Sequence, residues 1–404
     1  MELFEATREP LYLLFIDWEM AFDKITREGL ICSLRRLHLP EHILSVIGNM
    51  YQHTPFRVRD SDNVSQQEIQ STGIRQGCPL SPYLFILFMT VLMHDVEVSY
   101  RAEMGNAVHT HSAADPLFDL EYADDTVLMS RSSHSITKLL QCLQKEAEPY
   151  GMALNRAKTK LLVVNGPPAG VVTFTDNTPV HVVGDNESLE YLGTVLNRKG
   201  SPQITLTTRL ARAKQEFNKL AQFWSHANIK TALKVRVFKH FFYPMVLYGL
   251  THVWLTDSLR NRLDAWHCRC LRRIVRVKVS MISHVTNEVI YKKTDCQPIS
   301  KELESLQLKY FGHVVRAGIA DTIHNVTYNQ SHNTRTLNAT KRAGRPCHKW
   351  APGMELTVSR WATAQRPPFP IPVSQRQRVI FAKCEDRAGW RSFCALPTRR
   401  RDPP

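Results

Sequence analysis

The sequence of 404 residues predicts an α+β fold in which a sheet-containing part precedes a helical part. Two short continuous apolar runs, Leu11–Ile16 and Leu161–Val164, are typical of buried strands. The β-rich pieces Leu117–Glu121 and Thr126–Met129 are separated by a short polar turn, which predicts a hairpin. From Thr208 onward, large apolar residues recur at helical spacing instead. The change of period indicates that the two parts fold in different ways.

The first part is expected to contain several helices between its strands. Proline at a first helical turn is a start signal, so Ser81-Pro82 opens the longest of them. Gly151 is expected to end the last of them. We expect short helices at Gly29–Leu37 and His42–Tyr51, extended pieces at Phe56–Val58 and Glu68–Gln70, a buried helix at Ser81–Val98, a loop at Arg101–Pro116 and an amphipathic helix at Ile136–Tyr150.

The second part is expected to begin with three helices. The first carries an apolar stripe that ends at Trp224, the second spans Thr231–Phe242 and stops before Pro244, and the third ends at Ile274 with Asp257 or Ser258 as its cap. Beyond residue 320 the polar stretch 325–345 and the proline-rich stretch 366–372 are typical of linkers. The basic residues 398–401 are expected to form a frayed end.

Composition excludes several classes of protein. Hydrophobic residues make up 43% of the chain and charged residues 22%, which excludes collagen-like and wholly disordered proteins. The longest nearly apolar run, Tyr83–Met93, is shorter than the roughly 20 residues that cross a bilayer. The N-terminus lacks the pattern of a signal peptide. We therefore expect neither a membrane protein nor a secreted one.

Charge is distributed unevenly along the sequence. The formal net charge is +15, yet residues 1–150 hold 12 Lys and Arg against 21 Asp and Glu. Residues 201–280 hold 15 Lys and Arg against 3 Asp and Glu. Such a one-sided excess indicates a polyanionic partner for the second part, and its alternative is a solvated helix surface.

The nine cysteines are scattered, and an odd number in a chain without a signal peptide predicts reduced thiols. His267, Cys268 and Cys270 suggest a zinc site at first sight. Because Cys270 falls on the apolar face of a helical pattern, we interpret the three as core residues.

Three carboxylates occupy positions suited to metal binding. Asp17 follows a strand, and Asp124 and Asp125 lie at the tip of the expected hairpin. Carboxylates brought together repel one another unless divalent cations lie between them, and oxygen ligands favour Mg²⁺. Two such ions stabilise the attacking and leaving oxygens of a phosphoryl displacement. Taken alone, an Asp-Asp pair at a hairpin is more typical of a turn than of a metal site.

The surrounding motifs resemble those of reverse transcriptases. Tyr122-Ala-Asp-Asp125 is similar to the YxDD box, and Phe15–Asp23 resembles the first carboxylate motif. Further matches follow in the family's order. Thr72–Phe85 resembles the template- and nucleotide-contacting segment, and Gly151–Asn155 with Lys158-Thr159 resembles the motif after the hairpin. Tyr191–Gly193 is similar to the primer-grip turn. Tyr243–Gly249 and Cys268–Ile274 resemble non-LTR (LINE-type) retrotransposon enzymes.

This resemblance implies a role for each matching residue. Asp17, Asp124 and Asp125 would be catalytic and bind two Mg²⁺ ions. Phe22 would exclude a 2′-hydroxyl, although it could also be ordinary core. Nucleotide or template binding is implied for Arg75, Gln76, Gly77, Tyr122 and Lys158. Contact with the primer is implied for the primer-grip residues Tyr191, Leu192 and Gly193. Arg75 could instead be a surface cation, and Lys158 a solvated lysine.

The resemblance also implies a domain organisation, that of a right-hand polymerase. Residues 1–165 would form a palm with partial fingers, and 166–200 the primer-grip connection. Residues 201–280 would form a basic helical thumb, and 281–404 a helical connection with a poorly ordered basic tail. Because only 16 residues precede Asp17, we expect the fingers to be incomplete, the chain to be a truncated element, and primer extension to be weak.

The function implied is that of an RNA-directed DNA polymerase core. Its partners would be an RNA template, a DNA primer or target and a dNTP, with no membrane and no organic cofactor. Its location would be intracellular, with the nucleus favoured. The alternatives are a catalytically inactive nucleic-acid-binding remnant of such an element and, less favoured, a group II intron-type maturase.

Overall fold

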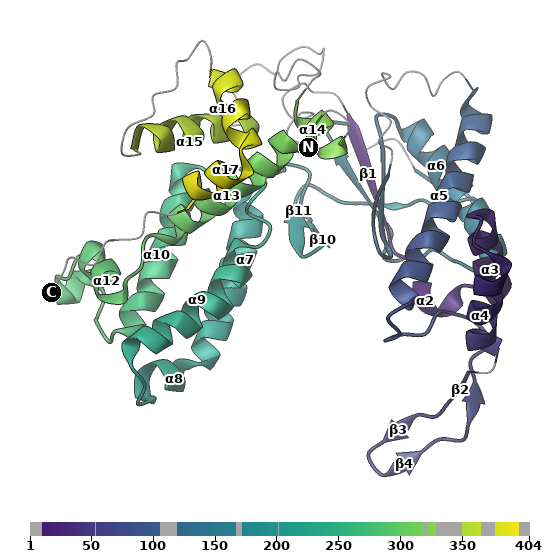
Figure 1. Cartoon of the computed structure of the whole chain (residues 1–404), viewed down its shortest axis with the longest axis horizontal. Coiled ribbons are helices and arrows are strands. Elements are labelled where there is room, and N and C mark those ends of the chain that lie inside the picture. The colour runs from purple at the N-terminus through teal and green to yellow at the C-terminus, as the bar shows by residue number, and fades with distance from the viewer. Residues whose placement is uncertain are drawn as a thin grey trace. The chain divides into compact units, whose positions relative to one another are not determined.

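The computed structural model describes residues 10–52, 54–105, 119–166, 172–200, 202–318, 321–328, 350–364 and 376–395. The chain divides into two compact units, the first ending at Glu187 and the second beginning at Ser188. The first contains a sheet covered by helices, and the second is mostly helical (Figure 1). The predicted α+β class is therefore confirmed.

A five-stranded sheet forms the centre of the first unit, in the order β6-β7-β1-β8-β9. β1 (Leu11–Ile16) pairs with both β7 and β8 in antiparallel fashion, and only β8–β9 is parallel. The other strands are β6 (Asp119–Tyr122), β7 (Asp125–Ser130), β8 (Lys160–Val164) and β9 (His181–Val182). The buried apolar runs read from the sequence are thus neighbouring strands of one sheet.

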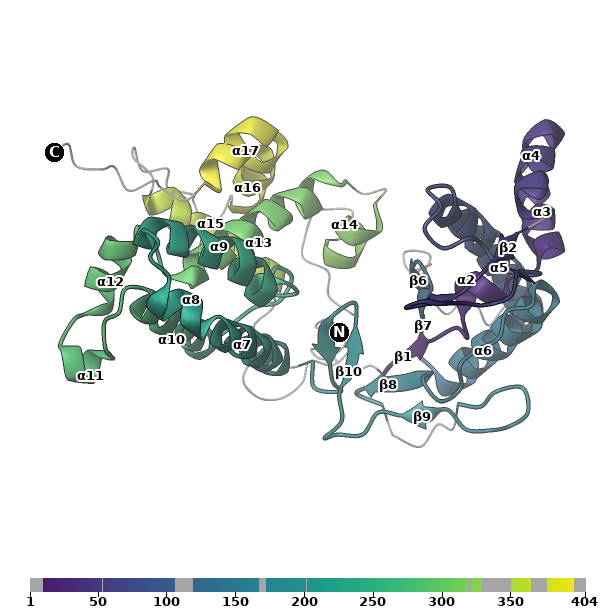
Figure 2. The same ribbon diagram turned by 90° about the horizontal axis from the view of Figure 1, so that it is seen from below.

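Helices α5 (Ser81–Met104) and α6 (Ser133–Ala147) lie together against one face of this sheet (Figure 2). Their buried side chains join those of β1 and β8 in a single apolar core. The remaining helices of the unit are α2 (Ala21–Lys24), α3 (Arg27–Arg36), α4 (Glu41–Gln52) and the 3₁₀ turn Glu148–Tyr150, which ends at Gly151 as predicted.

Helix α5 is longer than the sequence predicts. It continues to Met104, so residues 101–104 are helical rather than part of a loop; residues 106–116 of that expected loop lie outside the described residues. At 24 residues it is long and apolar enough to cross a membrane by length and composition. Phe85, Phe88 and Leu92 are buried in the core, however, so within this unit α5 serves as a core helix.

A narrow arm projects from the first unit between α4 and α5 (Figure 1). Its base is the pair β2 (Pro55–Phe56) and β5 (Glu68–Ile69), and its tip is the pair β3 (Arg59–Asp60) and β4 (Asn63–Val64). Every residue from Pro55 to Ile69 is exposed. The extended pieces expected here are confirmed, but they form no part of the core.

The second unit opens with a two-stranded hairpin and continues as helices. The hairpin is β10 (Leu189–Tyr191) and β11 (Thr194–Leu196). The helices that follow it are α7 (Pro202–Lys219), α8 (Ala221–His226), α9 (Thr231–Leu247), α10 (Asp257–Ile274), α11 (Ser280–Ser283), α12 (Asn287–Thr294) and α13 (Ile299–Arg316). Their apolar stripes form a second core, which buries His267, Cys268 and Cys270 as expected.

Three boundaries differ from the sequence prediction. The stripe that ends at Trp224 is split between α7 and α8 at Leu220. The cap of α10 is Thr256, whose Oγ1 accepts a hydrogen bond from the backbone N of Leu259 at 3.4 Å. Helix α9 runs through Pro244 to Leu247, because burial of Val246 and Leu247 outweighs the roughly 3 kcal/mol cost of an internal proline.

A third core lies within the second unit and was not predicted. It combines the second half of α13 with α15 (Trp350–Ala364), α16 (Arg376–Glu385) and α17 (Arg387–Phe393). Helix α14 (Thr322–Thr327) begins the stretch that was expected to be a linker. The expectation of a poorly ordered tail is therefore wrong for these helices. The proline-rich stretch 366–372, residues 398–401 and most of 325–345 lie outside the described residues.

Gly312 should be essential to this third core. The indole of Trp390 lies against it and donates to the carbonyl of Leu308 at 3.0 Å, and a Cβ at Gly312 would lie 2.0 Å from the indole nitrogen. We expect Gly312→Ala to destabilise the chain by about 1–3 kcal/mol, measured by urea unfolding. In the control, Gly48→Ala, the Cβ meets nothing within 4 Å, so this change should be neutral or stabilising. Equal stability of the two variants would contradict the prediction.

Candidate active site

Strand pairing brings the predicted catalytic carboxylates to one end of the sheet. In the β1–β7 pair Ile16 lies opposite Thr126, so the next residues outward are Asp17 and Asp125. Tyr122 pairs with Asp125 across the hairpin, which leaves Ala123 and Asp124 as its two-residue tip. Ala123 has a φ of 56°, a left-handed conformation that is unfavourable for alanine. The hairpin tip therefore holds strain beside the carboxylates.

The backbone around Asp17 is fixed from two sides. The indole of Trp18 is buried and donates to Oγ1 of Thr126 on β7 at 3.3 Å. The carbonyl of Asp17 accepts a hydrogen bond from the backbone N of Asn155 at 2.7 Å. These contacts hold Asp17 between the hairpin strand and the segment after Gly151, which is the fourth motif recognised in the sequence.

Electrostatic repulsion acts among the three aspartates. Partial burial raises the pKa of Asp125, and the negative charges of Asp124 and Asp17 raise it further. Lys158 supplies a neighbouring cation, with Nζ 3.6 Å from Oδ1 of Asp17. Both of these side chains are open to solvent, so this pair contributes little stability by itself. The site therefore favours additional positive charge.

The donor chemistry of this site suits a hard divalent cation, since three carboxylates lie at one end of the sheet beside solvent. As the side chains lie, no group of three or more His, Cys, Asp or Glu among the described residues is arranged closely enough to hold a metal ion. The strand register places the three carboxylates on neighbouring backbone positions, and all three side chains are at least partly open to solvent.

Phe22 and the segment after Thr72 form a second part of the site. The Phe22 ring stacks on Phe85 of α5, with 4.4 Å between centroids. Gly73 has a φ of 85°, and a Cβ there would lie 2.7 Å from the backbone of Phe22 and Asp23. The backbone N of Ile74 donates to the carbonyl of Phe22 at 2.6 Å. A glycine is therefore required where the two motifs meet.

Asp23 is a functional candidate that the sequence reasoning missed. Nε2 of Gln76 lies 3.3 Å from both carboxylate oxygens of Asp23, which fixes the predicted template-contacting side chain to the first motif. Its position at the end of the Phe15–Asp23 motif was the signal available. Arg75 lies over the ring of Tyr51 at 5.8 Å, and Gly77 has a φ of 83° with open space around it.

In the second unit, the predicted primer-grip residues form the turn of the β10–β11 hairpin. Tyr191 pairs with Thr194, and Leu192 and Gly193 both have positive φ. Arg209 donates to the carbonyl of Gly193, and the hydroxyl of Tyr248 donates to that of Leu192 at 2.9 Å. The Arg209 guanidinium also lies 4.6 Å from the centre of the Tyr248 ring.

Arg209 and Tyr248 were not singled out from the sequence, although Tyr248 lies in the Tyr243–Gly249 motif. The same hairpin and helix α9 line a largely apolar cavity of about 1050 Å³. Arg209 and Tyr248 thus connect the turn to the helices of the second unit and fix its orientation relative to them.

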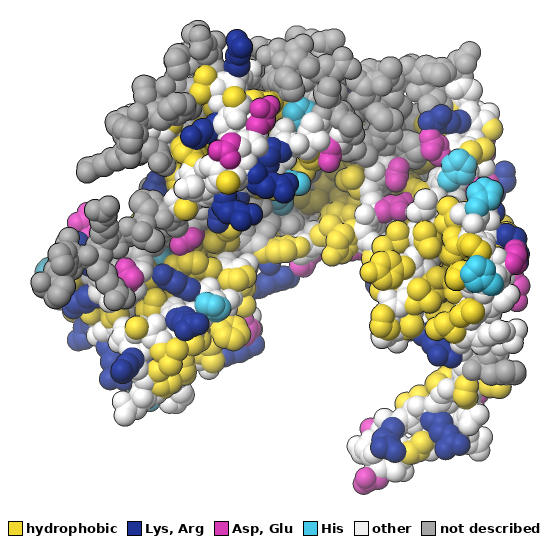
Figure 3. Space-filling model, in the orientation of Figure 1, with side chains coloured by type: hydrophobic (Ala, Val, Ile, Leu, Met, Phe, Trp, Pro, Cys, Tyr) yellow, Lys and Arg dark blue, Asp and Glu magenta, His cyan; other side chains and the backbone are white. Residues whose placement is uncertain are grey.

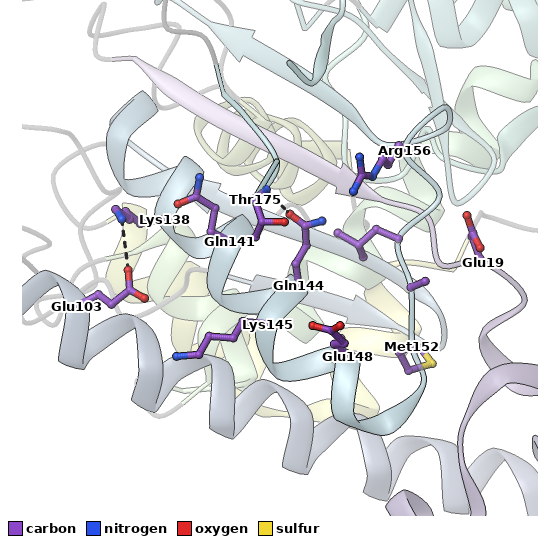
Figure 4. Close-up of a pocket in the computed structure, with 13 residues that line it drawn as sticks. Glu19, Glu103, Lys138, Gln141, Gln144, Lys145, Glu148, Met152, Arg156 and Thr175 are labelled. Atoms are coloured by element: carbon purple, nitrogen blue, oxygen red, sulfur yellow. Dashed lines mark hydrogen bonds and ion pairs between the residues drawn. The ribbon is translucent and has the colours of Figure 1, made fainter. Parts of the chain in front are cut away.

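A separate groove of about 690 Å³ lies beside α6 in the first unit (Figure 4). Its charged side chains are balanced, with carboxylates at Glu19, Glu103 and Glu148 and cations at Lys138, Lys145 and Arg156. Thr175 donates to Oε1 of Gln144 across it at 3.0 Å. None of the predicted site residues lines this groove, so it is distinct from the candidate active site.

Comparison with known proteins identifies the part of the chain that holds the three aspartates. The family model described as reverse transcriptase (RNA-dependent DNA polymerase) matches residues 2–196. Residues 2–196 are a reverse transcriptase domain. Its curated relatives are non-LTR retrotransposon polymerases, in agreement with the resemblance read from the sequence.

The relatives of this reverse transcriptase domain are distant. The chain is 24% identical to the R2 retrotransposable element polyprotein of Nasonia vitripennis over 48% of this chain and 19% of the relative. It is 24% identical to the RNA-directed DNA polymerase of the mobile element jockey of Drosophila melanogaster, over 64% and 28%, respectively. For the probable polymerase of the transposon BS of Drosophila melanogaster the identity is 25%, over 66% and 29%. The chain thus spans less than a third of each of these relatives.

Two solved structures similar to this chain are telomerases. The telomerase of Candida albicans with a fragment of telomeric RNA has a TM-score of 0.34 and 14% identity, over 81% of this chain and 52% of that chain. The telomerase of Candida tropicalis truncated from its C-terminal domain has a TM-score of 0.34 and 14% identity, over 48% and 35%.

Neutralising Asp125 should stabilise the reverse transcriptase domain in the absence of metal. Its raised pKa means that the ionised carboxylate is disfavoured in the folded chain. We expect Asp125→Asn to raise the melting temperature at pH 7 in EDTA, and the gain to vanish below the usual aspartate pKa of about 3.9. Added Mg²⁺ should raise the melting temperature of the wild type more than that of the variant.

The control for this melting experiment is Asp176→Asn. A hydrogen bond from the Thr178 hydroxyl and the ion pair with Arg156 lower the pKa of Asp176 to about 2. Its neutralisation should therefore lower the melting temperature at pH 7. A fall in both variants would show that the charges around Asp125 do not repel one another.

Proposed function

We propose that this chain is the core of an RNA-directed DNA polymerase that adds nucleotides to a primer on an RNA template. The 3′-hydroxyl of the DNA primer attacks the α-phosphate of a dNTP, and pyrophosphate leaves. The observation that carries the proposal is the register of β1 and β7, which sets Asp17 beside Asp125 with Asp124 at the adjoining tip. In this proposal the sheet of the first unit is the palm, and the basic helices α7–α10 are the thumb.

The three aspartates would hold two Mg²⁺ ions. When bound, these ions stabilise the charge that develops on the attacking and leaving oxygens. Asp17 and Asp124 would ligate both, and Asp125 would assist. Lys158, whose Nζ already lies 3.6 Å from Asp17, would face the triphosphate and could donate a proton to the leaving pyrophosphate.

The remaining site residues would position the nucleotide and the template. Gln76, held by Asp23, would contact the incoming base or the template, and the open space at Gly77 would let a nucleotide approach the backbone. The side chains of Tyr122 and Arg75 are exposed and would contact nucleotide or phosphate. The turn at Tyr191–Gly193 would grip the primer strand. An intracellular location, in the nucleus, accords with this activity.

Asp124→Asn tests the proposed activity. It removes the charge of a proposed metal ligand at the exposed tip and leaves the side-chain shape unchanged. Incorporation of dNTP on a primed RNA template, with the chain in excess over primer, should depend on Mg²⁺ and fall by about 10²-fold or more in the variant. Asp176→Asn should keep wild-type incorporation. Equal incorporation by the wild type and Asp124→Asn, or none by either, would contradict the polymerase proposal.

Phe22 tests the selection of deoxynucleotides. Its ring is half-buried and braced by Phe85, so it cannot retreat from a 2′-hydroxyl without losing that contact. We expect Phe22→Val to raise the ratio of ribonucleotide to deoxynucleotide incorporation by on the order of tenfold or more. Phe241→Val, which changes an exposed ring of the second unit, should leave the ratio unchanged. An unchanged ratio in Phe22→Val would show that the ring is only part of the core.

A further inference from the structure

A second candidate site lies at the C-terminal end of α10, within the second unit. It is a cavity of about 440 Å³ with five cationic side chains, and Ser225 and two valines complete its wall. The cations are Arg269, Arg272, Arg273, Arg276 and Lys278. They come from the last turns of α10 and from the chain that follows it directly. No motif recognised in the sequence assigns a ligand to this cavity.

The charge of the cavity is not compensated by the protein. No carboxylate lines it, and within the described part of the chain none of the five cations forms an ion pair with Asp or Glu. Like charges gathered in one hollow repel one another, and the low-dielectric wall strengthens the repulsion. An anion inside the cavity would relieve it.

Neutral acceptors hold three of these guanidinium groups in place. Arg272 is 5% exposed and donates to the carbonyls of Lys278 and Val285 and to Oδ1 of Asn287, at 3.1, 2.6 and 2.9 Å. Arg273 donates to Oδ1 of Asn218 at 3.0 Å, and Arg276 donates to the carbonyl of Ser225. The hydrogen bonds fix positions but leave the charge unneutralised, so the wall is organised before any ligand arrives.

The helix dipole explains only part of this cluster. Cations in the last turn of a helix are stabilised by about 0.3–1 kcal/mol each, which accounts for Arg272 and Arg273. Arg276 and Lys278 lie beyond the end of α10, and Arg276 has a φ of 57°, which is unfavourable for arginine. The structure therefore keeps a cation at this position despite a backbone cost.

We propose that this cavity binds consecutive phosphate groups of a nucleic-acid strand. Arginine is suited to phosphate because its planar fork of N–H donors matches two phosphate oxygens. The basic excess of residues 201–280 continues around the cavity, and Figure 3 shows Lys and Arg side chains over the helices of this unit. A continuous polyanion satisfies both the cavity and the surrounding charges, whereas a small anion satisfies only the cavity. This proposal rests on the proposed function, because it assumes a nucleic-acid substrate.

The test variant is the double change Arg269→Gln and Lys278→Gln. Both side chains line the cavity, both are exposed, and no hydrogen bond from either is needed to hold the wall. The control is Lys309→Gln with Arg387→Gln, which removes the same charges from exposed positions of α13 and α17, outside both the cavity and residues 201–280. Circular dichroism would establish that both full-length variants fold.

Affinity for a fluorescein-labelled RNA–DNA hybrid would be measured by anisotropy over a range of NaCl concentrations. Each lost phosphate contact lowers the slope of log affinity against log salt by about 0.7–0.9, so the cavity variant should lose about 1.4–1.8 and bind about tenfold more weakly at low salt. The control should keep the wild-type slope. Equal losses in both variants would overturn the proposal, since they would indicate diffuse surface charge.

Two further outcomes separate this proposal from the proposed function. If the wild type binds the hybrid and the cavity variant matches it, the cavity is not a nucleic-acid site while the polymerase proposal stands. If tripolyphosphate raises the melting temperature of the wild type but not of the cavity variant, and hybrid affinity is the same in both, the cavity takes a free polyphosphate instead. If the wild type binds no hybrid at all, both proposals fail.

Discussion

The position of β1 in the middle of the sheet is the constraint on which the candidate active site depends. Because it pairs with β7 on one side and β8 on the other, its register is fixed twice. A slip of one residue would turn every side chain of the strand to the opposite face and expose Leu14, which is fully buried. The same double pairing carries Asp17 to the hairpin tip. The strand register that buries the apolar side chains of β1 is therefore the same register that places Asp17 in the candidate active site.

Much of this first unit could be predicted because its signals are local. The limits of β1 match the apolar run Leu11–Ile16, and the YxDD hairpin and Gly151 follow from turn residues and glycine. The register of β1 against β7 could not be derived from periodicity, since more than 100 residues separate the two strands. The resemblance to reverse transcriptases implied only that Asp17 and the hairpin carboxylates share one site. The contacts of Asp23 with Gln76 and of Arg209 with Gly193 were missed because they join distant side chains without any sequence pattern.

The errors in the second unit have a common physical cause, which is that tertiary burial overrode local signals. Proline should have ended α9, and polar composition should have disordered the tail. The tail is instead joined to the helices by polar contacts: Arg260 lies 3.3 Å from Glu304, whose other oxygen accepts from the indole of Trp361 at 3.2 Å. Burial opposes ionisation of Glu304, but Lys301 and Arg260 outweigh it and lower its pKa. This pairing stabilises the fold at neutral pH and is lost on acidification.

The arm at Pro55–Ile69 has a thermodynamic consequence. Its two short strand pairs bury no apolar side chain, and Phe56, Val58, Val64 and Ile69 remain in water. The free energy of opening such a segment is close to zero, independent of the stability of the sheet. Its amides should exchange with deuterium far faster than those of β1, and a protease should cleave there first. In the first unit, the hydrogen bonds of the core sheet thus open only when the unit unfolds, whereas those of the arm open under native conditions.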